Sequence, residues 1–289
     1  MGKIKSRVGW HAWLGCLLTI TLAAVAASAA AGPVPLTGAT PGSVRSAATV
    51  VATCPQATSG SAVALAGSGE AVYVDVTGST SSPTMRRLYA AAAVAVVERA
   101  VAEKAALRIV AFGASGVGAR VLFDGSFADT SADEVFNLAA RNRQLCLAQQ
   151  AVAAAVGIRP DPLGGSDVSG SISAGIEALR GMVKPDGTIT LNVWSDGCQS
   201  PAARGPNRTL TNWCGQLAKG RSVAAILRAH ALEFTLPDAR GVAIVMRGIG
   251  VGAHARFAST LFAQRLIGFW ETVCRRAHAH ACVIESGLS

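Results

Sequence analysis

The sequence has no run of five basic residues, although its formal net charge is +9 at neutral pH. Its Lys and Arg residues are scattered, and no aromatic side chains are interleaved with them. Nucleic-acid-binding surfaces concentrate basic residues on one face and add aromatic rings on which bases stack. The sequence therefore argues against nucleic acid as a partner, and it favours a solvated surface that is rich in arginine.

Metal-binding cysteine patterns are also missing. No Cys-x-x-Cys pair and no Cys/His spacing typical of a zinc site occurs, and the five histidines are dispersed. His278-x-His280 is the only close pair of histidines, and by itself it is a weak signal. The sequence therefore predicts no zinc centre.

The cysteines are better explained as disulfides. Six of the seven cysteines follow the first 29 residues, and an even number in an exported chain predicts three disulfides, with fifteen possible pairings. Short loops favour the pairs Cys198–Cys214 and Cys274–Cys282. Cys54 would then pair with Cys146, or with a C-terminal cysteine if the chain ends meet.

Two enzyme motifs are present only in part. The segment Gly113–Val117 lacks the last glycine of a Gly-x-Ser-x-Gly nucleophile elbow. The glycines at 113 and 118 have the spacing of a phosphate-binding loop, but Ala119 and Arg120 stand where Lys and Ser or Thr are required. We interpret the segment as a hairpin turn and His254 as a capping or surface residue. A secreted serine hydrolase that uses Ser115 or Ser166 stays the alternative.

The N-terminus is typical of an export signal. Three basic residues within the first seven precede an apolar stretch, Leu14–Ala27, and Ala27-Ser28-Ala29 has the small-x-small pattern of a signal-peptidase site. We assign residues 1–29 to a signal peptide, with an uncleaved signal anchor as the alternative because the stretch approaches the ~20 residues that span a bilayer. Residues 30–69 are rich in Ala, Gly, Ser, Thr and Pro, and they predict a flexible segment before one domain at 70–289.

Strands and helices alternate through that domain. Apolar runs predict strands at 71–76, 107–112, 120–123, 188–194 and 241–246, with a short edge strand conceivable at 232–236. Helical spacing predicts helices at 84–104, 131–156, 169–183, 220–232 and 253–277; Ser131 begins a capping box. Continuous apolar strands require burial on both faces. The pattern predicts an α/β fold, an open, mostly parallel, doubly wound sheet with helices on both faces.

The first predicted strand ends in three oxygen donors, Asp75, Thr77 and Ser79. Carboxylate and hydroxyl oxygens are hard ligands that suit Mg²⁺ or Ca²⁺ and suit zinc poorly. The alternative is a purely structural role, in which Asp75 only caps the following turn. Ser82 and Pro83 then predict the start of a helix.

Two further loops carry oxygen donors. Ser166 follows two glycines and precedes a predicted helix, and Asp196 lies in Ser195-Asp196-Gly197 at the end of another predicted strand. In parallel sheets, ligands bind beyond the carboxyl ends of the strands where the strand order reverses. The three loops are therefore expected to meet.

This ordered triple resembles the von Willebrand factor A-type (integrin I-like) domain. The metal-ion-dependent adhesion site of that family has Asp-x-Ser-x-Ser, then a Thr on a glycine-preceded loop, then an Asp in a strand-end Asp-Gly. Residues 75–79 match with Thr77 for the first Ser, Ser166 stands in place of Thr, and Asp196-Gly197 matches the last element. The family usually has six strands, one more than the sequence clearly shows.

The resemblance implies a centre formed by Asp75, Thr77, Ser79, Ser166 and Asp196. It implies a bound Mg²⁺, or Mn²⁺ or Ca²⁺, with one open position that a carboxylate of a protein or glycan partner fills. The expected protein is a secreted or cell-surface adhesion module rather than an enzyme, and it would contact a membrane only if the N-terminal segment is retained as an anchor. The alternatives are a degenerate, metal-free site and a disulfide-stabilised domain without a ligand.

Overall fold

The computed structural model describes residues 54, 64–113, 119–159, 165–199, 213–252, 256–257 and 259–287. They all lie in one compact unit, Ala52–Ser289. The predicted signal peptide at 1–29 and most of the flexible segment at 30–69 lie outside the described residues, as do Ser115 and His254. Within the described ranges, no helix combines the length and the apolar character that a membrane crossing requires.

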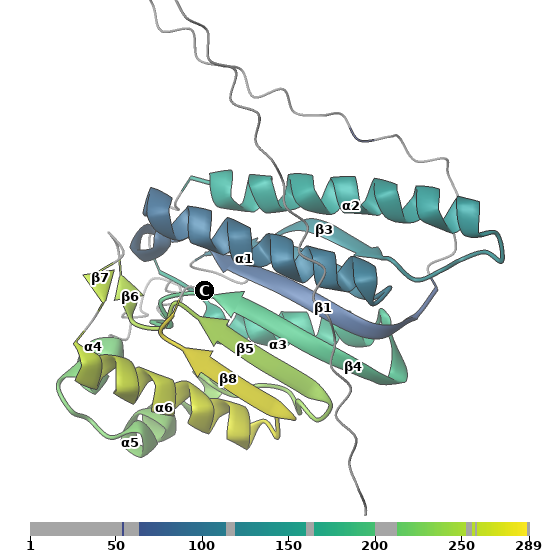
Figure 1. The fold of residues 1–289 in the computed structure, drawn as a ribbon. Helices are drawn as coiled ribbons and strands as arrows, with labels where there is room; N and C mark the ends of the chain where they lie inside the picture. Colours follow the sequence, from purple (N-terminus) through teal and green to yellow (C-terminus); the bar gives the residue numbers. More distant parts are fainter. Residues whose placement is uncertain are drawn as a thin grey trace, which may run out of the picture. The chain divides into compact units, whose positions relative to one another are not determined.

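The core of the structure is a six-stranded sheet with the order β3-β2-β1-β4-β5-β8 (Figure 1). Its strands are β1 (Ala66–Asp75), β2 (Ala106–Phe112), β3 (Arg120–Ser126), β4 (Val183–Trp194), β5 (Val242–Arg247) and β8 (Ala281–Glu285). All neighbouring strands are parallel except β2 and β3, which pair antiparallel. The chain builds outward from β1 in one direction and then from β4 in the other, so the strand order reverses between these two strands.

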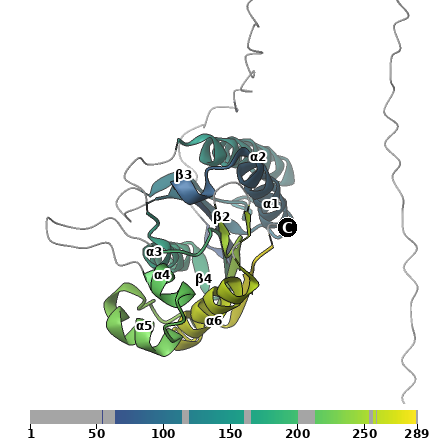
Figure 2. The same ribbon diagram turned by 90° about the vertical axis from the view of Figure 1, so that its left-hand side faces the viewer.

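Helices cover both faces of the sheet, which confirms the predicted α/β architecture. Figure 2 shows α1 (Pro83–Ala102) and α2 (Glu134–Gly157) on one side, and the remaining helices on the other. Those helices are α3 (Val168–Arg180), α4 (Trp213–Ala218), α5 (Val223–Ala229) and α6 (Thr260–Arg276). Alternate residues of β1 serve two separate cores: Ala71 and Tyr73 face the α3–α6 side, and Val72 and Val74 face α1 and α2.

Strand β1 begins at Ala66, several residues before the predicted start, so residues 66–69 belong to the sheet and not to a flexible segment. The glycines there had suggested a linker. At Gly69 a close approach explains the small residue, because an added Cβ would lie 2.6 Å from a methyl carbon of Val183. Glycine within a strand often marks such a close approach.

The sixth strand is β8, and the edge strand considered at 232–236 does not form, since Ala231–Glu233 is a 3₁₀ helix. The sequence does not predict strand β8, because this strand lies at the edge of the sheet. Its residues are half-buried or exposed, so they need no continuous apolar run. The observed count of six now equals the number expected from the family resemblance.

Several helix boundaries also differ from prediction. Helix α2 is capped by Asp133, whose side chain accepts hydrogen bonds from the N–H groups of Val135 and Phe136. Ser131 instead accepts a hydrogen bond from the Asp133 N–H, so the predicted capping box does not form. The last helix starts at Thr260 instead of 253, because β6 (Val251–Gly252) and β7 (Arg256–Phe257) pair first. The N-cap at Ser82 and Pro83 at N1 of α1 are confirmed.

Three disulfides join Cys54 to Cys146, Cys198 to Cys214 and Cys274 to Cys282. The two short loops confirm the prediction, and the structure selects Cys146 over a C-terminal partner for Cys54. The antiparallel pairing of β2 with β3 confirms the predicted hairpin, although its turn at 114–118 lies outside the described residues.

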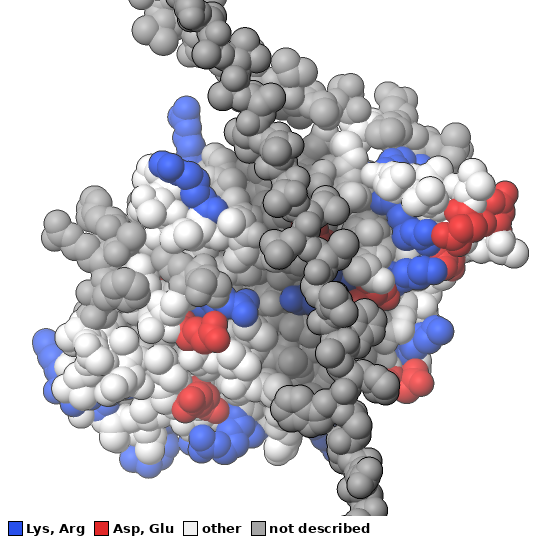
Figure 3. Space-filling view, viewed as in Figure 1, with Lys and Arg blue, Asp and Glu red and all other residues white. Residues whose placement is uncertain are grey.

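The charged surface is mixed. Arg141 pairs with Asp129 and Glu134, and Arg108 pairs with Asp124. On the face drawn in Figure 3, acidic side chains lie among basic ones, and no single basic stripe crosses it.

Candidate metal centre

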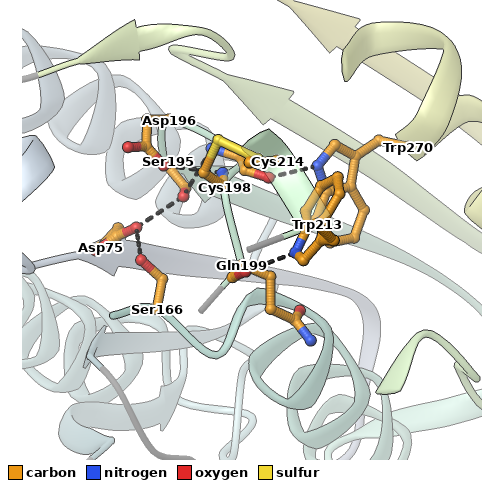
Figure 4. The surroundings of a disulfide bond; sticks show 10 residues. Asp75, Ser166, Ser195, Asp196, Cys198, Gln199, Trp213, Cys214 and Trp270 are labelled. Atoms are coloured by element: carbon orange, nitrogen blue, oxygen red, sulfur yellow. Dashed lines mark hydrogen bonds between the residues drawn. A yellow bond between two sulfur atoms is a disulfide. The ribbon is translucent and has the colours of Figure 1, made fainter. Parts of the chain in front are cut away.

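The predicted oxygen donors lie where the strand order reverses. Asp75 ends β1, and Ser195 and Asp196 follow β4, which pairs directly with β1 so that Val74 lies opposite Trp194. Ser166 precedes helix α3, and the Asp167 N–H donates to the Gly113 carbonyl oxygen after β2. Figure 4 shows Asp75, Ser166, Ser195 and Asp196 together, with Asp75 hydrogen-bonded to both serines.

The carboxylate of Asp75 is the hub of the centre. Its Oδ1 accepts hydrogen bonds from the Thr77 N–H at 3.0 Å and from Thr77 Oγ1 at 2.7 Å. Its Oδ2 accepts from Ser166 Oγ at 2.8 Å and from Ser195 Oγ at 2.7 Å. A side chain that is only 2% exposed therefore binds one residue from each of the three predicted loops.

Three hydroxyl oxygens lie next to one another beside that carboxylate. Thr77 Oγ1 is 3.2 Å from Ser79 Oγ and 3.3 Å from Ser166 Oγ. Adjacent ligands of an octahedral Mg²⁺ at about 2.1 Å are about 3 Å apart, so these separations fit neighbouring coordination positions. Ser79 is half-buried, so solvent reaches the hydroxyl cluster on its side.

Two of these hydroxyls donate to a carboxylate, because Thr77 and Ser166 each form a hydrogen bond to Asp75. The third, Ser79, interacts with Asp196 and partly opposes the rise in the pKa of that carboxyl. Each hydroxyl has one proton and two lone pairs, so its lone pairs stay available for another partner. The donor set therefore fits a hard cation, which would bind the lone pairs without breaking the hydrogen bonds to the carboxylates.

No ion pair balances the two carboxylates within the described part of the chain. Among the described residues, neither Asp75 nor Asp196 forms an ion pair with a Lys, Arg or His. Burial and the negative charge of Asp75 raise the pKa of Asp196 to about 6, against hydrogen bonds from Ser79 and from the Cys198 N–H. Burial also raises the pKa of Asp75 above its ordinary value. A divalent cation would supply the missing positive charge.

The centre differs in composition from a carboxylate or histidine cluster. In the part of the chain that the structure describes, no group of three or more His, Cys, Asp or Glu side chains could hold a metal ion. The five predicted ligands comprise two carboxylates and three hydroxyls. The structure places them together.

Ser195 is a member of the centre that the sequence did not single out. Its hydroxyl donates to Asp75 and also accepts a hydrogen bond from the Gly197 N–H at 3.1 Å. The available signal was a hydroxyl residue directly after a buried strand. Its partner is 120 positions away, so only the pairing of β1 with β4 reveals its role.

A rigid support holds the loop after Asp196 (Figure 4). Asp196 Oδ1 accepts a hydrogen bond from the N–H of Cys198. A disulfide joins Cys198 to Cys214, at the start of α4. Trp270 Nε1 donates to the Gly197 carbonyl oxygen at 2.9 Å, and Trp213 Nε1 donates to that of Gln199 at 2.5 Å. The rings of Trp213 and Phe269 stack with centroids 4.3 Å apart. The interior of the disulfide loop, 200–212, lies outside the described residues.

Gln199 links this loop to the one that carries Ser166. Its side-chain oxygen accepts a hydrogen bond from the Ser169 N–H, in the first turn of α3, at 2.7 Å. Gln199 is 1% exposed, so solvent does not compete for this bond. The positions of Ser166 and Asp196 are therefore coupled through the protein.

Replacing Gly197 with Ala is expected to destabilise the protein by roughly 2 to 4 kcal/mol, from left-handed backbone strain and overpacking together. Its φ is +77°, and an added Cβ would lie 2.7 Å from Ile249 Cδ1 and 3.1 Å from Trp270 Nε1. Gly241→Ala is the matched control, since Gly241 has a φ of +76° and open space around it. Urea unfolding should show the larger loss for Gly197→Ala, and equal losses would contradict the packing argument.

The geometry gives little support to a serine hydrolase. Ser166 Oγ donates to Asp75 and contacts Thr77, and no hydrogen bond within the described ranges joins it to a histidine. His230 instead lies 3.4 Å from Glu233, and His278 lies 3.6 Å from Asp238.

No protein-family model matches the chain, and no curated protein matches it. Solved structures are similar at a distance. They include the pilus adhesin SpaC from Lactobacillus rhamnosus GG (10% identity, 78% of this chain and 29% of that chain, TM-score 0.41). Proximal thread matrix protein 1 from the mussel byssus has 16% identity over 78% of this chain and 44% of that chain, with a TM-score of 0.35.

An aerotolerance-related membrane protein from Bacteroides fragilis has 9% identity over 75% of this chain and 90% of that chain, with a TM-score of 0.37. The chain spans less than half the length of the adhesin and of the thread protein. TM-scores this low assign neither a family nor a function. The fold is defined by the strand order and the helical layers of the chain itself.

Proposed function

We propose that this protein is an exported, divalent-cation-dependent binding module that captures an acidic group of a protein or glycan partner. One observation carries the proposal. Hydroxyls of Thr77, Ser79 and Ser166, from two separate loops, lie side by side next to two buried carboxylates that have no ion-pair partner among the described residues. This is the arrangement expected from the family resemblance.

The residues divide into two groups with different tasks. Thr77, Ser79 and Ser166 would hold the cation through neutral hydroxyl oxygens, and Asp75 and Asp196 would orient those hydroxyls by accepting their protons. A bound Mg²⁺ or Mn²⁺ would supply a positive charge and a position for a ligand oxygen. Because the oxygens that touch the cation would be neutral hydroxyls, with the carboxylates behind them, the cation would still attract an incoming carboxylate at its open position.

The disulfides support export. Three disulfides in one chain are typical of an oxidising compartment. Together with the signal peptide predicted at 1–29, they favour a secreted or cell-surface protein. We infer a carboxylate-bearing protein or glycan partner from the same chemistry, since a cation with an open position selects for an anionic oxygen.

Paramagnetic relaxation of a small carboxylate tests this function. Mn²⁺ bound to the wild-type protein should relax the methyl protons of added acetate, and should relax those of methylammonium far less. Asp196→Asn should abolish the protein-dependent effect. Asp124→Asn should retain it, because Asp124, on β3, belongs to an exposed ion pair with Arg108 on β2. Equal relaxation of the two probes, or an effect that survives Asp196→Asn, would refute the proposal, and the lack of any protein-dependent relaxation in the wild type would favour a metal-free structural domain.

A further inference from the structure

Tyr89 carries a buried hydroxyl that the centre as described leaves unused. Tyr89 lies in α1 and is 0% exposed, and its hydroxyl has no hydrogen-bond partner among the residues that the structure describes. A buried polar group without a partner destabilises the folded state. Phenylalanine would fill the same space without this cost, so the hydroxyl calls for an explanation.

The surroundings of Tyr89 connect it to both carboxylates. It packs in the same core as Val74 and Val76, which flank Asp75, and as Trp194, which directly precedes Ser195 and Asp196. Burial, and after it the negative charges of Asp75 and Asp196, raise the pKa of Tyr89 well above its ordinary value. The phenol is therefore protonated at neutral pH, and a hydrogen bond that it donates to an acceptor would stabilise the folded protein.

Proteins commonly hold metal-orienting carboxylates with further hydrogen-bond donors, and losing such a donor typically costs 10–100-fold in metal affinity. Asp75 already accepts four hydrogen bonds from protein groups, two at each oxygen. At Asp196, Oδ1 accepts a hydrogen bond from the Cys198 N–H at 2.9 Å, and Ser79 interacts with the carboxylate. Asp196 therefore has the greater remaining capacity to accept a proton from Tyr89.

We propose that Tyr89 is a positioning residue for the cation centre, whose hydroxyl donates a hydrogen bond to the Asp196 side of the carboxylate pair, directly or through one water, when the cation is bound. This inference rests on the proposed function. It assigns α1 a role in cation affinity that is separate from packing.

The substitution Tyr89→Phe separates this role from a structural one. Mn²⁺ affinity, measured by electron paramagnetic resonance of the free ion, should fall about 10–100-fold. The melting temperature in EDTA should stay the same or rise slightly, because the unpartnered hydroxyl is gone. The chain has only two tyrosines, and Tyr73→Phe is the matched control because Tyr73 is equally buried but faces the opposite core. This control should bind Mn²⁺ like the wild type.

Raman spectroscopy can test the hydrogen bond of Tyr89 directly, because the chain has only two tyrosines. In Tyr73→Phe the tyrosine doublet of the Raman spectrum reports Tyr89 alone, and adding Mg²⁺ should shift its intensity ratio toward that of a hydrogen-bond donor. An unchanged doublet, or Tyr89→Phe with wild-type Mn²⁺ affinity, would overturn the inference while leaving the proposed function intact. A wild-type protein that binds no Mn²⁺ would overturn both.

Discussion

Stabilisation by Mg²⁺ or Mn²⁺ is expected to be strong at about pH 7.5 and to vanish near pH 5, because cation and protons compete for the same centre. The raised pKa of Asp196, about 6, sets the midpoint of the loss. Asp75, whose pKa is also raised, adds to the effect in the same direction. Below pH 6 the apparent cation affinity should fall about tenfold per pH unit for each proton that the cation must displace.

The metal-free protein should show the opposite trend. Unfolded Asp has a pKa of about 3.9, so between that value and about 6 the folded state binds more protons than the unfolded state. The free energy of unfolding therefore falls as pH rises through this window, by at most about 3 kcal/mol for Asp196. Acidification from neutral pH should thus stabilise the protein in EDTA and remove its stabilisation by Mg²⁺.

Thermal melts from about pH 4 to 8, with EDTA or with Mg²⁺, measure both trends. The two curves should converge at low pH and separate above pH 6. Asp196→Asn should flatten the EDTA curve through the same window, since the titrating group is removed. Curves that stay parallel across the range would contradict the assignment of Asp196 to the cation centre.

Loss of the Cys198–Cys214 disulfide should weaken cation binding at least tenfold, whereas loss of Cys274–Cys282 should leave it unchanged. The Cys198 N–H donates to Asp196 Oδ1 at 2.9 Å, so the first disulfide fixes a carboxylate of the centre. The second joins the end of α6 to β8, and among the described residues no hydrogen bond links either of its cysteines to the five predicted ligands. Support of ligand-orienting groups of this kind is typically worth 10–100-fold in affinity.

The two disulfides form a matched pair for this comparison. They close loops with sequence separations of 16 and 8 residues. Chain-entropy estimates for these loops are about 3 and about 2.5 kcal/mol, so double Cys→Ser variants should lose similar stability. Calorimetric Mn²⁺ titration at a temperature where both variants are folded isolates the difference in affinity. Equal affinities in the two variants would show that the disulfide does not position Asp196.

The sequence predicted the parts of the fold that have their own local signal. Central strands such as β1 and β4 are buried on both faces and read as continuous apolar runs. The edge strand β8 lacks this signal because its side chains are partly exposed. The start of α2 was misplaced because Ser131 and Asp133 both suit an N-cap, and only the hydrogen bonds to Val135 and Phe136 distinguish them.

In the candidate metal centre, too, the residues with a local sequence signal could be predicted and the others could not. Asp75, Thr77 and Ser79 are adjacent in sequence and could be recognised together, and the resemblance added Ser166 and Asp196. Ser195 and Tyr89 could not be found in this way. Ser195 reaches Asp75 only because β4 pairs with β1, and Tyr89 is one of several buried residues on α1 until its unpartnered hydroxyl is seen.

A crystal structure grown with Mn²⁺ at about pH 7.5 tests the convergence of these loops on a cation most directly. Anomalous scattering at the manganese edge should place one ion within about 2.2 Å of Thr77 Oγ1, Ser79 Oγ and Ser166 Oγ. The hydrogen bonds from Thr77 and Ser166 to Asp75 should be retained. A map without a peak among these three oxygens, with Mn²⁺ at saturating concentration, would contradict the account.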